Sequence, residues 1–194
     1  FMKSRAGFAL IELLVGLVIL AIVGLLAWRG LDSILRAKDV IENRMRSSAQ
    51  IDQVVSQWVT DCEMLVRLEN SAVSPALVHQ NSLWLLRRTF KNRDVYWQIV
   101  RYQLINQQLE RSVSRLFQID TTSLDLWVGF SREMDSRIGP FQKTFQIDFV
   151  ERQEFRLFFN SESTNRQLQG MQVDWWFKDT LLPLSKSCLS GIRI

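Results

Sequence analysis

Histidine and cysteine are scarce in this chain of 194 residues, which contains one histidine and two cysteines. Two cysteines exclude a disulfide-dense scaffold and a four-cysteine zinc site. A single histidine, His79, argues against histidine-based metal sites and catalytic triads. We therefore expect no cofactor and no metal ion, and we interpret His79 as a surface or packing residue.

The sequence also lacks the common catalytic and nucleotide-binding motifs. It has no G-x-S-x-G elbow, P-loop, dinucleotide-binding fingerprint, H-E-x-x-H pair or EF-hand loop. The acid pairs Asp61/Glu63 and Glu151/Glu154 are typical of solvated faces. We expect no calcium site, because arginines interrupt the one acidic run, which comprises Asp120, Asp125, Glu133 and Asp135 with Arg132 and Arg137 among them. The chain is predicted not to be an enzyme and to have no catalytic residues.

A strong charge of either sign is absent as well. The chain has 24 basic and 20 acidic residues, a formal net charge of +4 and a sequence pI near 9.4. This excess is too small and too scattered to predict a nucleic-acid partner. The hydrophobic share of 47% and the charged share of 23% are ordinary for folded protein, and the length suits one globular domain with an appendage.

Much of the apolar content lies in one block, Phe8 to Trp28, whose single charged residue is Glu12. A helix of this length spans roughly 31 Å, about the thickness of one hydrocarbon core. Lys3 and Arg5 precede the block, and basic residues favour the cytoplasmic side of a membrane. We predict a transmembrane helix over 8–28, with the N-terminus in the cytoplasm and the chain after about residue 29 on the other side.

Glu12 separates three interpretations of this block. A cleaved secretory signal has a shorter apolar core, with small residues before the cut. A plain signal anchor does not explain the carboxylate, which costs about 2–3 kcal/mol inside a spanning helix. The third interpretation explains it, because a leader with Lys3, Arg5 and Gly7, followed by Phe8, Glu12 and an apolar stretch, resembles the type IV prepilin signal.

The resemblance implies that a prepilin peptidase removes the leader 1–7 by cutting between Gly7 and Phe8, and then N-methylates Phe8. Glu12 becomes the fifth residue of the mature chain. Its carboxylate can then neutralise the new α-amine or that of a neighbouring subunit, and two buried opposite charges offset part of each other's desolvation. We therefore expect Glu12 to act in assembly by setting the register between packed subunits.

Glycine and proline are absent from Leu31 to Ser74. Apolar residues recur there at spacings of three and four, which predicts that the helix continues as an amphipathic helix through the segment 29–70. We expect its last helical residue to be at about Leu68. The alternative is a membrane anchor followed by a separate stalk helix.

After Pro75 the apolar pattern changes to a period of two. Ser82–Phe90, Tyr96–Leu104 and Leu109–Val113 are predicted to form an antiparallel meander. Further predicted strands are Phe145–Val150, Phe155–Phe159, Met171–Lys178 and one that begins at Cys188, whereas Leu124–Phe130 fits a short helix or a strand. The predicted fold class is α+β and pilin-like: a long N-terminal helix, transmembrane and then amphipathic, packs against antiparallel β-sheet in a globular domain over 71–194.

The run Leu-Ala-Trp-Arg-Gly-Leu-Asp at 26–32, where the helix leaves the predicted membrane, resembles minor pseudopilin J of type II secretion systems. The order of a long helix, a meander, a Trp-rich strand, a Leu-Pro pair and a closing strand is similar to that family too. The resemblance implies a structural subunit at the tip of a short periplasmic pseudopilus that helps to export folded proteins. Its implied partners are I- and K-like minor pseudopilins, the major pseudopilin, the prepilin peptidase and the inner-membrane assembly platform. It would be a single-pass protein of the bacterial inner membrane with a periplasmic globular domain.

Two further features bear on this reading. Cys62 and Cys188 would lie outside the cytoplasm, where a disulfide persists, but spacing does not show proximity and their pairing stays open. Most of the tryptophans are expected in the core. The consecutive Trp175 and Trp176 point to opposite faces of a strand; we expect both in the core, and the alternative is that one of them is an exposed interface anchor.

Two alternatives remain open. The first is a minor pilin of a type IV or DNA-uptake pilus, for which the basic residues Arg87, Arg88, Lys91 and Arg93 give a reason. The second is a membrane-anchored periplasmic binding or sensor domain that keeps residues 1–7.

Overall fold

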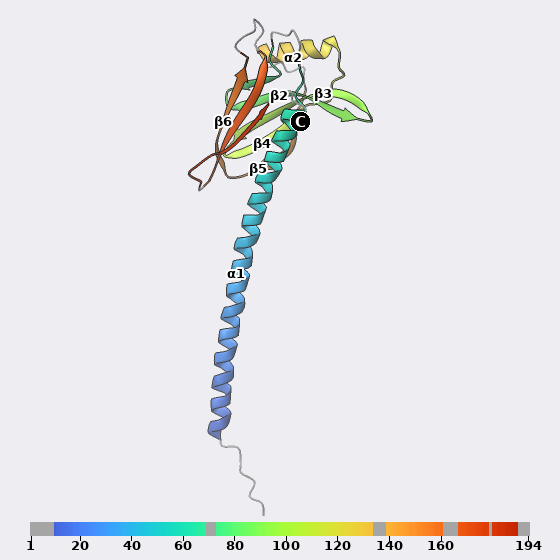
Figure 1. The fold of residues 1–194 in the computed structure, drawn as a ribbon. Coiled ribbons are helices and arrows are strands. Elements are labelled where there is room, and N and C mark those ends of the chain that lie inside the picture. The colour runs from blue at the N-terminus through green and yellow to red at the C-terminus, as the bar shows by residue number, and fades with distance from the viewer. Residues whose placement is uncertain (1–9, 69–72, 134–138, 161–166, 179, 190–194) are drawn as a thin grey trace, which may run out of the picture. The chain divides into compact units, whose positions relative to one another are not determined.

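The computed structural model describes residues 10–68, 73–133, 139–160, 167–178 and 180–189. The chain divides into two compact units, Phe1–Ala49 and Gln50–Ile194. The helix α1 (Leu10–Glu63) begins in the first unit, and its last turns belong to the second (Figure 1). The boundary between the units therefore lies within the helix, about twenty residues before the predicted start of the globular domain.

In the first unit, α1 exposes nearly all of its side chains. The apolar residues of its first turns are exposed, and Trp28 is 72% exposed. Beyond them the surface becomes charged, with ion pairs one turn apart between Arg36 and Asp32 at 2.7 Å and between Lys38 and Glu42 at 3.4 Å. Pairs of this kind stabilise a helix by a few tenths of a kcal/mol, about 0.3–0.5 each.

The helix ends at Glu63, earlier than the sequence pattern predicts. The N–H of Val66 donates to the carbonyl of Leu86 at 3.0 Å, and the N–H of Arg88 donates to the carbonyl of Met64 at 2.7 Å. The backbone after Glu63 therefore pairs with a strand. The expected end at about Leu68 is wrong, because long-range backbone pairing outweighs the local helical pattern.

The second unit contains two antiparallel sheets. The first has the order β1-β2-β3-β4-β5, and its strands are β1 (Ala76–His79), β2 (Ser82–Lys91), β3 (Asp94–Ile105), β4 (Gln108–Val113) and β5 (Gln142–Ile147). The predicted meander is confirmed as β2–β3–β4, whereas the short β1 was not predicted. Tight turns join the meander, at Asn92–Arg93 and at Asn106–Gln107, and all four of these residues have positive φ, as two-residue hairpin turns require.

The second sheet has the order β6-β7-β8, drawn in orange to red in Figure 1. Its strands are β6 (Val150–Phe159), β7 (Leu168–Phe177) and β8 (Leu184–Leu189). The predicted closing strand thus begins earlier than Cys188, just after Pro183, and its predicted continuation over 190–194 lies outside the described residues.

The segment that fits a helix or a strand forms the helix α2 (Thr121–Glu133). Asp120 precedes it and accepts the N–H of Ser123 on its side-chain Oδ1 at 2.7 Å, which is an N-cap. The indole N–H of Trp127 donates to the carbonyl of Ser74 at 3.1 Å and ties α2 to the segment before β1.

Two hydrophobic clusters fill the second unit, one on each face of the first sheet. On one face, Leu85, Val100 and Leu109 pack with the end of α1 and with the second sheet. On the other face, Leu86 and Ile99 pack with α2, and further members of that cluster are Val66, Trp97, Phe117, Trp127 and Phe130. The last turns of α1 are therefore part of the core of the second unit.

Candidate processing and assembly sites

The predicted processing residues Gly7 and Phe8 lie outside the described residues. The predicted assembly residue Glu12 lies in the first turn of α1, and its side chain is exposed. An acidic group at this end of a helix interacts favourably with the helix dipole. By length and composition, the apolar part of α1 is long enough to cross a membrane, and it fits a single-pass membrane anchor.

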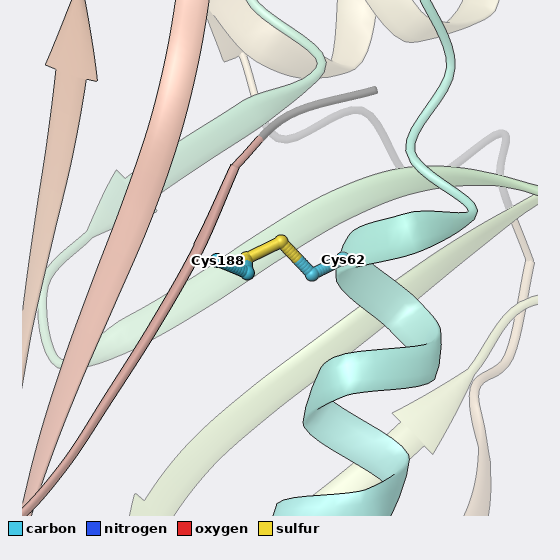
Figure 2. The surroundings of a disulfide bond; sticks show 2 residues. All are labelled: Cys62 and Cys188. Carbon is cyan, nitrogen blue, oxygen red and sulfur yellow. A yellow bond between two sulfur atoms is a disulfide. The ribbon is translucent and has the colours of Figure 1, made fainter. Parts of the chain in front are cut away.

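The two cysteines are joined by a disulfide in the structure. Cys62 lies in the last turn of α1 and Cys188 lies near the end of β8, with 6.3 Å between their Cα atoms (Figure 2). The bond connects residues 126 positions apart in the sequence. It links α1 covalently to the last strand of the second sheet.

Next to Cys62, Asp61 lies fully buried at the centre of a polar cluster. Arg111 of β4 makes a bidentate contact with its carboxylate, with Nε 2.7 Å from Oδ2 and Nη2 2.8 Å from Oδ1. The Nη1 atom of Arg87 in β2 lies 2.5 Å from Oδ1, and the hydroxyl of Tyr102 in β3 donates to Oδ2 at 2.7 Å. Gln57, one turn earlier in α1, donates from Nε2 to Oδ1 at 3.0 Å. We call these five residues the Asp61 cluster.

Burial and the contacts within the cluster shift the pKa values of two of its members, Tyr102 and Arg111. Burial and the neighbouring Asp61 carboxylate raise the pKa of Tyr102 well above 10.0, so its hydroxyl keeps the proton that it donates. Burial alone would lower the pKa of Arg111, but the hydrogen bonds and charge of Asp61 outweigh this and raise it. The cluster brings the guanidinium groups of Arg87 and Arg111 to the single carboxylate of Asp61 in a buried position. Such an arrangement persists only when its hydrogen bonds are well satisfied.

The sequence interpretation missed this cluster. The expectation that Asp61 and Glu63 both lie on a solvated face is wrong for Asp61, which binds cations in the core, whereas Glu63 is exposed. A signal was present, because Asp61 falls on the apolar face of α1, three residues after Trp58 and next to Cys62. A buried acid needs buried donors, and Arg111 occupies an inward position of its strand between Leu109 and Val113.

The structure also corrects the interpretation of the basic residues in β2 and in the turn that follows it. The side chain of Arg87 is only 14% exposed, and it forms an ion pair with Asp61 and donates a hydrogen bond to Gln98. It does not face outward with Lys91 and Arg93, which are exposed. The observation that favoured DNA is weakened accordingly.

The tryptophans are mainly structural. Trp58 of α1 is fully buried, with ring centroids 5.6 Å from Tyr102 and 5.8 Å from Trp175, both in edge-on contacts. Trp175 is fully buried, whereas Trp176 is half-buried beneath the guanidinium of Arg152, 4.1 Å from its ring centroid. Trp176 is thus the more accessible of the pair, as the alternation of a strand requires.

Of the other residues considered from the sequence, His79 is exposed and Asp120 caps α2. Glu154 contacts Arg152. Among the residues that the structure describes, no group of three His, Cys, Asp or Glu side chains is arranged to hold a metal ion. Asp135 lies outside the described residues.

Residues 2–28 match the family described as Prokaryotic N-terminal methylation motif. A comparison with curated proteins gave no match. The matched segment contains the predicted cut between Gly7 and Phe8, as well as Glu12 and the apolar part of the helix. This N-terminal motif, together with the long apolar helix followed by antiparallel sheets, supports a place for the chain in the type IV prepilin and pseudopilin superfamily.

Proposed function

We propose that this protein is a structural subunit of a filament assembled from the bacterial inner membrane, and specifically a J-like minor pseudopilin of a type II secretion system. The N-terminal methylation motif over residues 2–28 supports the first, broader part of the proposal, a subunit of the prepilin type. Under this proposal, a prepilin peptidase removes residues 1–7 and methylates Phe8. The helix then stays in the membrane until the subunit enters the filament. The second unit then lies in the periplasm, at the tip of a short pseudopilus.

The chemistry of Glu12 supports an assembly role. Cutting after Gly7 would create an α-amine one helical turn from the Glu12 carboxylate. In a bundle of apolar helices, an amine and a carboxylate that pair offset part of each other's desolvation, whereas either charge alone remains costly. When the amine that pairs with Glu12 belongs to a neighbouring subunit, the pair forms only if the two helices align, and in this proposal that requirement makes Glu12 a register-setting residue.

The J-like assignment within the superfamily depends on the run 26–32 and on the order of elements in the second unit. It supplies the proposed partners: I- and K-like minor pseudopilins, the major pseudopilin and the inner-membrane assembly platform. The protein would contribute surfaces for assembly and no catalysis. The exposed apolar face of α1 in the first unit is the kind of surface that lipid or other helices of a filament would cover.

The experiment that tests the processing step is mass spectrometry of the full-length protein from bacterial membranes, with and without prepilin peptidase. The expected result is an N-methylated Phe8 that depends on the peptidase. An intact N-terminus in a strain with active peptidase would refute the proposal and favour an anchored periplasmic receptor.

A pair of variants then separates processing from assembly. Glu12→Gln removes the charge and keeps the shape, so we expect normal cleavage but loss of co-purification with the other subunits. Glu42→Gln is the matched control, because Glu42 is a partly exposed acid of the same helix whose ion pair with Lys38 is local. Normal co-purification of the Glu12→Gln protein would contradict the role given to this carboxylate.

Partner selectivity separates a secretion pseudopilus from a pilus. Binding to I- and K-like subunits, with no salt-sensitive binding to DNA, is the expected outcome. Salt-sensitive DNA binding without binding to those subunits would favour the DNA-uptake pilus instead.

A further inference from the structure

The end of α1 is held to the two sheets by different kinds of bond. The Asp61 cluster joins it to β2, β3 and β4 of the first sheet through Arg87, Tyr102 and Arg111. The disulfide of Cys62 joins it to β8 of the second sheet. Asp61 and Cys62 are adjacent in the sequence, so the position of one determines the position of the other.

The Asp61 carboxylate meets its donors in one register of the helix. Its three sheet donors project from neighbouring strands on one face, where Arg87 lies opposite Gln98 and Arg111 lies opposite Tyr102. A slip of one residue turns a helical side chain by about 100° around the helix axis. That turn would remove the carboxylate from both arginines and leave buried cations unpaired. Buried ionic groups add little net stability, but they can select a register.

The two attachments connect residues over different separations in the sequence. All members of the Asp61 cluster lie within residues 57–111, whereas Cys188 lies in the last described strand. The ionic attachment can therefore form across at most 50 residues, whereas the covalent one must close across 126 residues. The Cα atoms of the two cysteines are 6.3 Å apart, and pairs beyond about 7 Å are not bridged without backbone movement.

We propose that the Asp61 cluster docks the end of α1 on the first sheet in a single register, and that this docking positions Cys62 to pair with Cys188. Asp61 is then a positioning residue for disulfide formation, and the inference does not depend on the proposed role in secretion. It accounts for a buried carboxylate directly beside the cysteine.

The step to be measured is thiol–disulfide exchange with oxidised glutathione. One protein thiolate attacks a glutathione sulfur and releases one glutathione thiolate, which leaves a mixed disulfide. The second protein thiolate attacks the protein sulfur of that mixed disulfide and releases the second glutathione thiolate. Two protein thiols lose two protons and two electrons, and oxidised glutathione becomes two molecules of reduced glutathione. Docking affects the second, intramolecular attack, because that attack depends on where Cys62 is held.

The first experiment follows reoxidation of the reduced full-length chain in detergent micelles. Alkylation and mass spectrometry resolve the mixed disulfide from the closed bond. Asp61→Asn should slow closure by about ten-fold or more, because the isosteric amide keeps the volume but loses the charge that holds both arginines. Val54→Ala is the matched control: Val54 is a fully buried residue of the same helix outside the cluster. Equal slowing by the two variants, or closure of Asp61→Asn at the wild-type rate, would overturn the proposal.

The second experiment tests docking without the covalent bond. In the full-length Cys62→Ser/Cys188→Ser protein, the amides of residues 57–63 should keep their protection from hydrogen exchange. Adding Asp61→Asn should speed their exchange by about ten-fold or more. Loss of protection on removal of the cysteines alone would show that the bond holds the helix, and would overturn the proposal.

A milder variant covers the case in which Asp61→Asn fails to fold. Arg87→Gln removes one donor and leaves the bidentate contact of Arg111 with Asp61 in place. It should slow closure to a smaller extent than the loss of the carboxylate. Closure at the wild-type rate in this variant would also count against the proposal.

Discussion

Removing the bond between Cys62 and Cys188 should lower the free energy of unfolding of the second unit substantially. The bond connects residues 126 positions apart, and it therefore restricts a large part of the unfolded chain. For a loop of this size, the lost loop-closure entropy corresponds to about 5 kcal/mol at about 25 °C. This value is comparable to the whole stability of many small domains, about 5–15 kcal/mol.

The assay is equilibrium unfolding of the full-length chain in detergent micelles by guanidinium chloride, followed by tryptophan emission. Six of the seven tryptophans lie in the second unit at buried or half-buried positions: Trp58 at the end of α1, and five others in α2 and the strands. The reduced wild-type protein isolates the bond, because its thiols fill the same space. The Cys62→Ser/Cys188→Ser protein should lose slightly more stability than the reduced protein, because it places a hydroxyl at the fully buried position of Cys62.

The result that would refute this reasoning is a loss below about 1 kcal/mol on reduction, with an unchanged dependence on denaturant. It would mean that the cysteines are not paired in the protein or that the unfolded chain is already compact. Alkylation of the oxidised protein distinguishes these two explanations, because paired cysteines do not react.

Three further outcomes follow from the structure. Trp58→Ala should cost about 3–5 kcal/mol of unfolding free energy by circular dichroism, because this ring is fully buried between the end of α1 and both sheets; a loss near zero would contradict that packing. Gly170→Ala should cost about 1–3 kcal/mol in the same assay, because its β-carbon would lie 2.8 Å from the backbone oxygen of Cys188; unchanged stability would show that β8 moves freely away. Stability should fall as pH rises above 10.0, because folding raises the pKa of Tyr102 and the unfolded chain releases that proton first; Tyr102→Phe should reduce this loss. In the Tyr96→Phe protein Tyr102 is the single tyrosine, so absorbance at alkaline pH reports its titration directly, and a midpoint at or below 10.0 would contradict the burial argument.

Local patterns in the sequence were sufficient for much of this molecule. The apolar block with Glu12 and the basic leader indicated the prepilin-type N-terminus, which the methylation-motif match supports. Alternation of apolar residues located the β2–β3–β4 meander, because a strand with one buried face repeats every two residues. Each of these signals depends on neighbours in the sequence, and the α+β fold class follows from them.

The tertiary structure decided the features that depend on distant partners. The helix ends at Glu63, since the next residues pair with β2, although their apolar spacing continues the helical pattern. Arg87 faces inward because Asp61 lies on the helix above it, and no local signal on β2 reports that carboxylate. The separation of β6–β8 into a second sheet likewise depends on which strands pair. Periodicity determines which face of an element is apolar. Which partner covers this face, and which charge is buried there, depend on contacts between elements that are distant in the sequence.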